Sequence, residues 1–252
     1  MSISTTPLGR LWKRFRNASA PAAPRSDGAV TRTSDGNFRA QFISVNHRNC
    51  IEVADSAHQA FDVRAARIKG SVTVRGQSRE VACSAGCSHC CNLYVSATAS
   101  ELLLIEGYIR ALPTAEQDTI RMRVQIAARH AQGKSIAQRD SRRVRCPFLS
   151  AQGMCDIYPI RPLTCRAYIS FDLPACAYDF QHPGKGTVVT RSGSLESIRN
   201  DMLTQLHTKE RASGGVGGNF ELIQAMHILL NSDAHVADLA DGKNVIYQAM
   251  CH

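Results

Sequence analysis

The sequence has few aromatic residues and no long apolar stretch. Only 6% of its 252 residues are Phe, Trp or Tyr, too few to supply the stacking platforms that hold single-stranded nucleic acids. The longest aliphatic run, Leu102 to Ile105, ends at Glu106, far short of the roughly 20 residues that a helix needs to span a bilayer. No apolar segment of a secretory signal follows the basic start of the chain. We therefore expect a soluble, cytoplasmic protein, in a compartment that disfavours disulfides and leaves thiolates available for metal.

The common arrangements of catalytic residues are also missing. The chain has no Ser/His/Asp order, no phosphate-binding loop and no paired acids. Glu101 and Glu106 fall on different faces of a predicted helix, and Asp156 is typical of a turn. Apart from His89, which lies within a cysteine-rich segment, the histidines follow no ligand spacing. Few segments have the character of strands, which argues against the barrel of radical S-adenosylmethionine enzymes.

Positive charge is concentrated near the start of the chain. The net charge is +9, and residues 1–26 hold five basic side chains and no acid. We expect residues 1–35 to form a flexible basic arm, because Ser, Thr, Ala, Pro and Arg dominate it. Apolar residues in this arm recur at helical spacing. The pattern is either incidental or indicates a short amphipathic helix that binds an anionic surface, an import receptor or an acidic protein. Nucleic acid is not expected as a partner. The apolar positions of this periodicity are Leu8, Leu11, Trp12 and Phe15.

The remaining residues, 36–252, predict a single, mainly α-helical domain with irregular loops organised around a cysteine-ligated metal site. Apolar residues recur at helical spacing, and Gly or Pro ends several of the segments. Only Ser71–Val74 resembles a strand. The basic link 134–145 and the turn-rich segment 146–176 are expected to be irregular, and the glycine-rich segment 213–218 flexible. The predicted helices cover about residues 51–69, 98–112, 114–132, 195–209 and 220–230. Ser96 or Thr98 can cap the second of these helices, and Gln117 is placed for a capping box with Thr114 at the start of the third.

Eight of the ten cysteines fall in two blocks between about residues 80 and 180. The first block has four thiols within nine residues, and the second spreads four thiols over a longer, Pro-containing segment. Cys50 and Cys251 lie outside both blocks and are expected to be ordinary buried cysteines. The predicted metal ligands are Cys83, Cys87, Cys90, Cys91, Cys146, Cys155, Cys165 and Cys176.

The spacing of these cysteines explains why they are expected to bind metal. Thiolates two or three residues apart can turn toward one ion, and a residue such as Gly86 tolerates the positive φ of the tight turn. Cys90 and Cys91 are adjacent and point in different directions, so one of them faces a different metal or bridges two. Eight thiols fit two four-thiolate sites, one cluster with four spare thiols, or a dinuclear site. Isolated buried cysteines and a disulfide framework are the alternatives.

Soft thiolate ligands favour zinc, copper(I) or iron–sulfur over magnesium or calcium. The all-cysteine set predicts zinc or iron, with a 4Fe-4S cluster as one form of the iron. His89 is either a substitute ligand or a solvent-facing neighbour. Four thiolates around a divalent ion leave a net charge near −2, which basic side chains could offset. Arg161 and Arg166 lie between and beside ligands and are expected to do so, whereas Arg142 and Arg143 are expected to be solvated.

The second block contains Cys146-Pro147-Phe148-Leu149 and the segment from Cys155 to Arg166, which follows the pattern CxIYxxRPxxCR. Together with the first block it resembles the cysteine-cluster family that has a zinc- or iron-chelating domain, whose signature is CxxCxxCC. The first block departs from this signature, because three residues rather than two separate Cys83 from Cys87. The resemblance covers about residues 80–180 and implies metal chelation. One branch of the family, the flagellin lysine N-methylase group, implies an iron–sulfur cluster and S-adenosylmethionine.

Three functions remain open from the sequence. The first is metal binding without catalysis, in which the metal holds a helical scaffold together or is carried by it. The second is an iron–sulfur enzyme that uses S-adenosylmethionine for protein lysine N-methylation or a related methyl-transfer or redox reaction. Its basis is the spacing Cys83-x3-Cys87-x2-Cys90, which in radical enzymes leaves one cluster iron open. The third is a regulator or adaptor that uses the basic arm.

Overall fold

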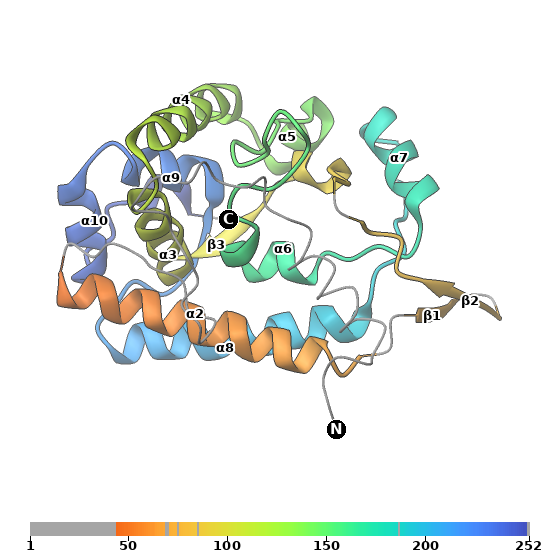
Figure 1. The fold of residues 1–252 in the computed structure, drawn as a ribbon, viewed down its shortest axis with the longest axis horizontal. Helices are drawn as coiled ribbons and strands as arrows, with labels where there is room; N and C mark the ends of the chain where they lie inside the picture. Colours follow the sequence, from red (N-terminus) through yellow and green to blue (C-terminus); the bar gives the residue numbers. More distant parts are fainter. Residues whose placement is uncertain (1–43, 69–70, 75, 85, 186, 251–252) are drawn as a thin grey trace.

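The computed structural model describes residues 44–68, 71–74, 76–84, 86–185 and 187–250. This part of the chain is mainly helical with little sheet, which confirms the mainly α-helical part of the predicted fold class (Figure 1). The predicted amphipathic segment around Leu8 to Phe15 and the cysteine at position 251 lie outside the described residues. No helix of the described ranges is long and apolar enough to cross a membrane.

Two long helices lie side by side along one edge of the molecule (Figure 1). Helix α2 (Val45–Ala65) begins where the Ser44 side chain accepts a hydrogen bond from the His47 backbone N–H, and α8 (Gly193–Ala212) begins in the same way at Ser192. Apolar side chains from the facing sides of these two helices form a buried cluster with the short helix α6 (Leu163–Ala167). This cluster includes Phe61, Leu163, Ala167, Leu195, Met202 and Leu206.

The larger apolar core lies around α3 (Ala99–Arg110), which is buried on nearly every side. Helices α4 (Thr114–Ala131), α9 (Leu222–Leu229) and α10 (Asp233–Ala240) pack around this core, and the 3₁₀ turn η4 (Tyr247–Ala249) closes it. The run Leu102–Ile105 explains the position of α3, because four consecutive aliphatic side chains can all be buried only in a helix that is surrounded.

The strands form two small antiparallel pairs. Strands β1 (Ser71–Val74) and β2 (Gln77–Glu80) form a hairpin, in which Gly76 has the positive φ of +78°. Strands β3 (Ser96–Thr98) and β4 (Asn219–Glu221) pair inside the molecule, with Ser96 opposite Glu221. The second pair joins the cysteine-rich part of the chain to its last third.

Short helices occupy the segments that the sequence predicts to be irregular. The first cysteine block ends in the 3₁₀ turn η2 (His89–Asn92). The second block contains η3 (Tyr158–Ile160), α6 and α7 (Leu173–Gln181). The basic link contains α5 (Ile136–Arg142), which begins with a capping box formed by Ser135 and Gln138. The predicted irregularity is therefore wrong for parts of both segments.

Several predicted boundaries are also corrected. Helix α2 begins six residues before the predicted start at 51 and ends at Ala65. The predicted capping box of α4 is absent, because the Gln117 side chain donates to the carbonyls of Arg110 and Leu112 instead. Helix α3 is capped by Thr98, one of its two predicted caps, with Glu101 completing a capping box.

Candidate metal centre

All eight predicted ligands lie in the described part of the chain as half-buried, free thiols, as does Cys50. In the first block, Cys83 and Cys87 lie in the loop before η2, and Cys90 and Cys91 lie on η2 itself. In the second, Cys146 and Cys155 flank a turn, Cys165 lies on α6 and Cys176 on α7. The short helices that the sequence did not predict therefore carry four of the eight thiols.

The two cysteine blocks are joined through their backbones. The N–H of Cys146 donates to the carbonyl of Cys91 over 2.8 Å. The turns of the two blocks also meet, because a Cβ placed on Gly153 would lie 3.4 Å from the carbonyl oxygen of Gly86. Both glycines have a positive φ, +83° at Gly86 and +77° at Gly153, which side-chain-bearing residues rarely adopt. The blocks are thus parts of one folded unit.

Cys90 affects the ionisation of two groups of thiols. In the first group, charge on Cys87, Cys90 and Cys176 adds to burial in raising the pKa of Cys83, to about 11. In the second group, burial is the largest cause of the raised pKa values, and the charge on Cys90 adds to it. The pKa of Cys155 is raised to about 11 and that of Cys165 to about 12. The pKa of Cys146, in the same group, is raised by burial and then by Cys155.

Cys91 completes this arrangement. A hydrogen bond between the Cys90 and Cys91 thiols is the largest cause of the raised pKa of Cys90, ahead of its burial. A like charge nearby disfavours ionisation, so these effects place the interacting thiols in one neighbourhood. Charges on Cys87, Cys90 and Cys176 act on Cys83, which gives one set of interacting thiols. Cys146, Cys155 and Cys165 form the other set, and Cys90 acts on each of its members.

Backbone N–H groups point at three of the sulfurs. The N–H of Ser170 donates to Cys83 Sγ over 3.2 Å. Cys146 and Cys155 each accept a hydrogen bond from the backbone two residues further on, at Phe148 and Ile157, and each bond lowers the pKa of its thiol against the effect of burial. Donors aimed at sulfur stabilise the thiolate, which is the form that binds metal.

Arg161 supplies the positive charge of this region. Its guanidinium lies 4.3 Å from the centre of the Tyr158 ring. Its charge lowers the pKa of three thiols, Cys90, Cys155 and Cys165, although burial and neighbouring thiols raise those pKa values overall. Of the two arginines expected to offset thiolate charge, Arg161 is thus the one whose charge acts on these thiols.

Two of the other three arginines, Arg166 and Arg143, behave differently from the prediction. Arg166 makes a two-pronged ion pair with Asp62, at 2.8 and 2.9 Å, so its charge is matched by a carboxylate rather than by thiolates. Arg143 is not a solvated residue of the link, because it pairs with Asp179 at 3.0 Å and its guanidinium lies 5.8 Å from the centre of the Phe180 ring. It thereby joins the end of α5 to α7. Arg142 is exposed, as expected.

His89 contacts an aromatic ring on α7. Its imidazole lies 5.4 Å from the centre of the Phe180 ring, in a tilted arrangement. Within the described ranges, no group of three or more Cys, His, Asp and Glu side chains is closed enough to hold an ion. The structure therefore brings the eight thiols into one region but does not itself show a cysteine-ligated site.

Comparison with known proteins supports metal binding by this region. Residues 82–182 match the model of the CxxCxxCC family, described as a "putative zinc- or iron-chelating domain". The similarity covers this segment and not the rest of the chain. No curated protein and no solved structure matches the chain. The domain includes every one of the eight cysteines and supports metal binding in general, with zinc or iron as the metal.

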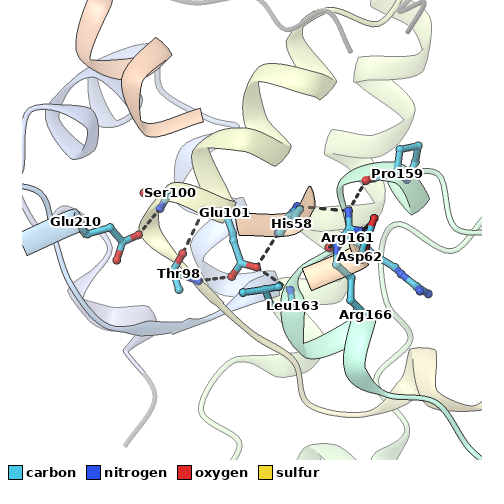
Figure 2. A network of polar contacts seen from close by, with 10 residues as sticks. All are labelled: His58, Asp62, Thr98, Ser100, Glu101, Pro159, Arg161, Leu163, Arg166 and Glu210. Atoms are coloured by element: carbon cyan, nitrogen blue, oxygen red, sulfur yellow. Dashed lines mark hydrogen bonds and ion pairs between the residues drawn. The ribbon is translucent and has the colours of Figure 1, made fainter. Parts of the chain in front are cut away.

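A buried polar network holds the chelating domain against α2, and sequence reasoning missed it (Figure 2). Glu101, which is 0% exposed, accepts hydrogen bonds from His58 Nε2 at 2.9 Å, from the Leu163 N–H at 2.7 Å and from the Thr98 N–H at 2.9 Å. These bonds outweigh burial and lower the pKa of Glu101. The carboxylate is thus ionised, and it fixes the first residue of the helix that carries Cys165.

The network continues through His58 to Arg166. Burial lowers the pKa of His58, so its ring is neutral and donates from Nε2 to Glu101. This tautomer leaves Nδ1 to accept from Arg166, 3.4 Å away. Arg166 also donates to the carbonyls of Pro159 and Arg161. The segment from 159 to 166 is therefore held at both ends by buried charge. The only signals in the sequence were the place of His58 in an apolar helical pattern and that of Glu101 in a helix cap.

Proposed function

We propose that the chain is a metal-binding protein that chelates zinc or iron through all eight cysteines, in two adjacent four-thiolate sites. Cys83, Cys87 and Cys176 contribute three ligands to one site, and Cys146, Cys155 and Cys165 contribute three to the other. The adjacent pair Cys90–Cys91 provides the fourth ligand of each. The electrostatic effect of Cys90 on thiols of both groups is the observation that supports this proposal.

Three features support ion binding rather than a set of inert buried thiols. Backbone N–H groups point at the sulfurs of Cys83, Cys146 and Cys155. The guanidinium of Arg161 is buried beside the second group, where it offsets thiolate charge. Turns with positive φ at Gly86 and Gly153 bring the two cysteine blocks together, as two metal-binding knuckles require.

The second candidate is an iron–sulfur enzyme that uses S-adenosylmethionine. The observation in its favour is the electrostatic contact of Cys83 with Cys87 and Cys90, the three cysteines whose spacing resembles that of enzymes with an open cluster iron. The 4Fe-4S cluster, its S-adenosylmethionine and lysine N-methylation belong to this candidate alone. A third role, an adaptor with a basic arm, concerns residues outside the described ranges.

Purification without oxygen separates the two metal chemistries. We expect about two zinc or iron ions per chain and no acid-labile sulfide, since eight thiolates complete two tetrahedral sites. A brown protein that contains sulfide and absorbs near ~400 nm, from thiolate-to-iron charge transfer, would contradict the two-ion proposal and favour the cluster enzyme. The assay is elemental analysis and sulfide determination on the same sample as the visible spectrum.

A further inference from the structure

A cavity of about 160 Å³ lies apart from the eight cysteines, where α2, α3, α8 and α10 meet. Its rim includes Ser213, Gly215 and Val216, which belong to the segment that the sequence predicts to be flexible. This segment is held in place, because the Gly215 N–H donates to the Glu210 carbonyl over 2.7 Å. It also packs closely on the turn after α10, since a Cβ on Gly242 would lie 2.1 Å from the Gly214 carbonyl oxygen. Only glycine allows that approach.

Glu210 on α8 lines this cavity, although the residue is only 4% exposed. One of its oxygens, Oε1, accepts a hydrogen bond from the Ser100 N–H at 2.9 Å. The other, Oε2, is buried and has no hydrogen-bond partner among the described residues. Figure 2 shows this second oxygen turned away from Ser100. A buried oxygen without a donor costs free energy unless a ligand or water supplies one.

The other lining residues favour a ligand with positive charge. Asp241 also lines the cavity, where it accepts a hydrogen bond from Asn46 at 2.8 Å. Charge on Glu210 and Asp241 adds to burial in raising the pKa of the Cys50 thiol to about 11. None of the described residues that line the cavity is basic. Aliphatic side chains complete the wall, including Leu103 and Leu239.

We propose that this cavity binds a primary alkylammonium ion, with the ammonium donating to Glu210 Oε2 and the alkyl chain against the aliphatic wall. An ammonium group supplies the missing donor and the compensating charge at once. A neutral alcohol supplies a donor without the charge, and an anion would meet Glu210 and Asp241. The site goes beyond the proposed metal binding, because none of the eight cysteines lines it.

Protonation of Glu210 gives the site a definite pH dependence. Burial raises the pKa of Glu210 to about 7, against the hydrogen bond from the Ser100 N–H, and charge on Glu101 raises it further. The other titratable groups of the wall are Asp241 and Cys50. An ammonium ion binds the ionised carboxylate, so its affinity rises as the pH increases through 7. Between pH 6 and pH 8 the ionised fraction changes about tenfold.

The test is calorimetric titration of the full, metal-loaded chain with n-butylammonium chloride. We expect saturable binding at pH 8, about tenfold weaker binding at pH 6, and no saturable binding of 1-butanol. Glu210→Gln should lower the affinity at least tenfold, because it removes the charge but keeps an acceptor for Ser100. Glu52→Gln, which removes an exposed acid of α2, should leave the affinity unchanged.

If Glu210→Gln does not fold, a second variant tests the same cavity. Val53→Phe would fill part of the cavity and leave Glu210 in place, and it should also abolish binding. Binding of 1-butanol as tightly as n-butylammonium would overturn the proposal. So would full affinity in a folded Glu210→Gln or Val53→Phe chain, or the absence of saturable binding to the unmodified protein.

Discussion

Cys165→Ser is expected to lose about half of the bound metal and to unfold the segment around α6. Serine cannot replace a thiolate ligand, and in structural sites the free energy of metal binding is also folding free energy, about 10–16 kcal/mol for zinc. Cys165 lies on a helix of only five residues, which cannot be stable by itself. The measurement is elemental analysis of the purified variant, together with its thermal unfolding followed by circular dichroism.

Cys50→Ser is the matched control for this experiment. Cys50 is also half-buried and free, but it lies on α2, outside both cysteine blocks. Its substitution should leave the metal content unchanged. A Cys165→Ser protein that retains two ions per chain would show that Cys165 is not a ligand.

Glu101→Gln is expected to destabilise the protein by about 1–3 kcal/mol, the usual cost of leaving a buried hydrogen-bond donor without an acceptor. Glu101 accepts three hydrogen bonds at its two oxygens, from His58, Leu163 and Thr98. An amide has only one oxygen, so its NH₂ group would face at least one of these donors. Urea unfolding of the metal-loaded protein measures the change in free energy.

The same variant should also weaken metal retention during dialysis against a chelator, because Glu101 holds the first residue of α6. Glu52→Gln again serves as the control, since substitution of an exposed acid usually changes stability by less than about 0.5 kcal/mol. A loss below about 1 kcal/mol in Glu101→Gln would mean that the network does not hold the chelating domain in place.

The helices that could be predicted from the sequence are those with long apolar periodicity and clear ends. Helix α3 has a threonine cap and α4 is followed by Gly133, so their extents lie close to the prediction. Helices α6 and α7 have five and nine residues and begin beside Pro162 and Pro174. Such short helices depend on tertiary contacts rather than on periodicity. The capping box at Ser135, by contrast, was a local signal that could have revealed α5.

The candidate site was only partly predictable, because spacing along the chain does not determine which thiols meet. The sequence indicated eight thiols in two blocks and the separate roles of Cys90 and Cys91. It could not show that Cys176 lies near Cys83, which is distant from it in the chain. The network of His58, Glu101 and Leu163 joins three segments, and each residue taken alone has an ordinary local role.

X-ray absorption at the edge of the bound metal tests the central proposal most directly. If cysteine thiolates alone hold the metal, zinc should show four sulfur neighbours at about 2.3 Å and no nitrogen or oxygen shell. A mixed shell that contains nitrogen or oxygen at about 2.0–2.2 Å would contradict an all-cysteine set of ligands.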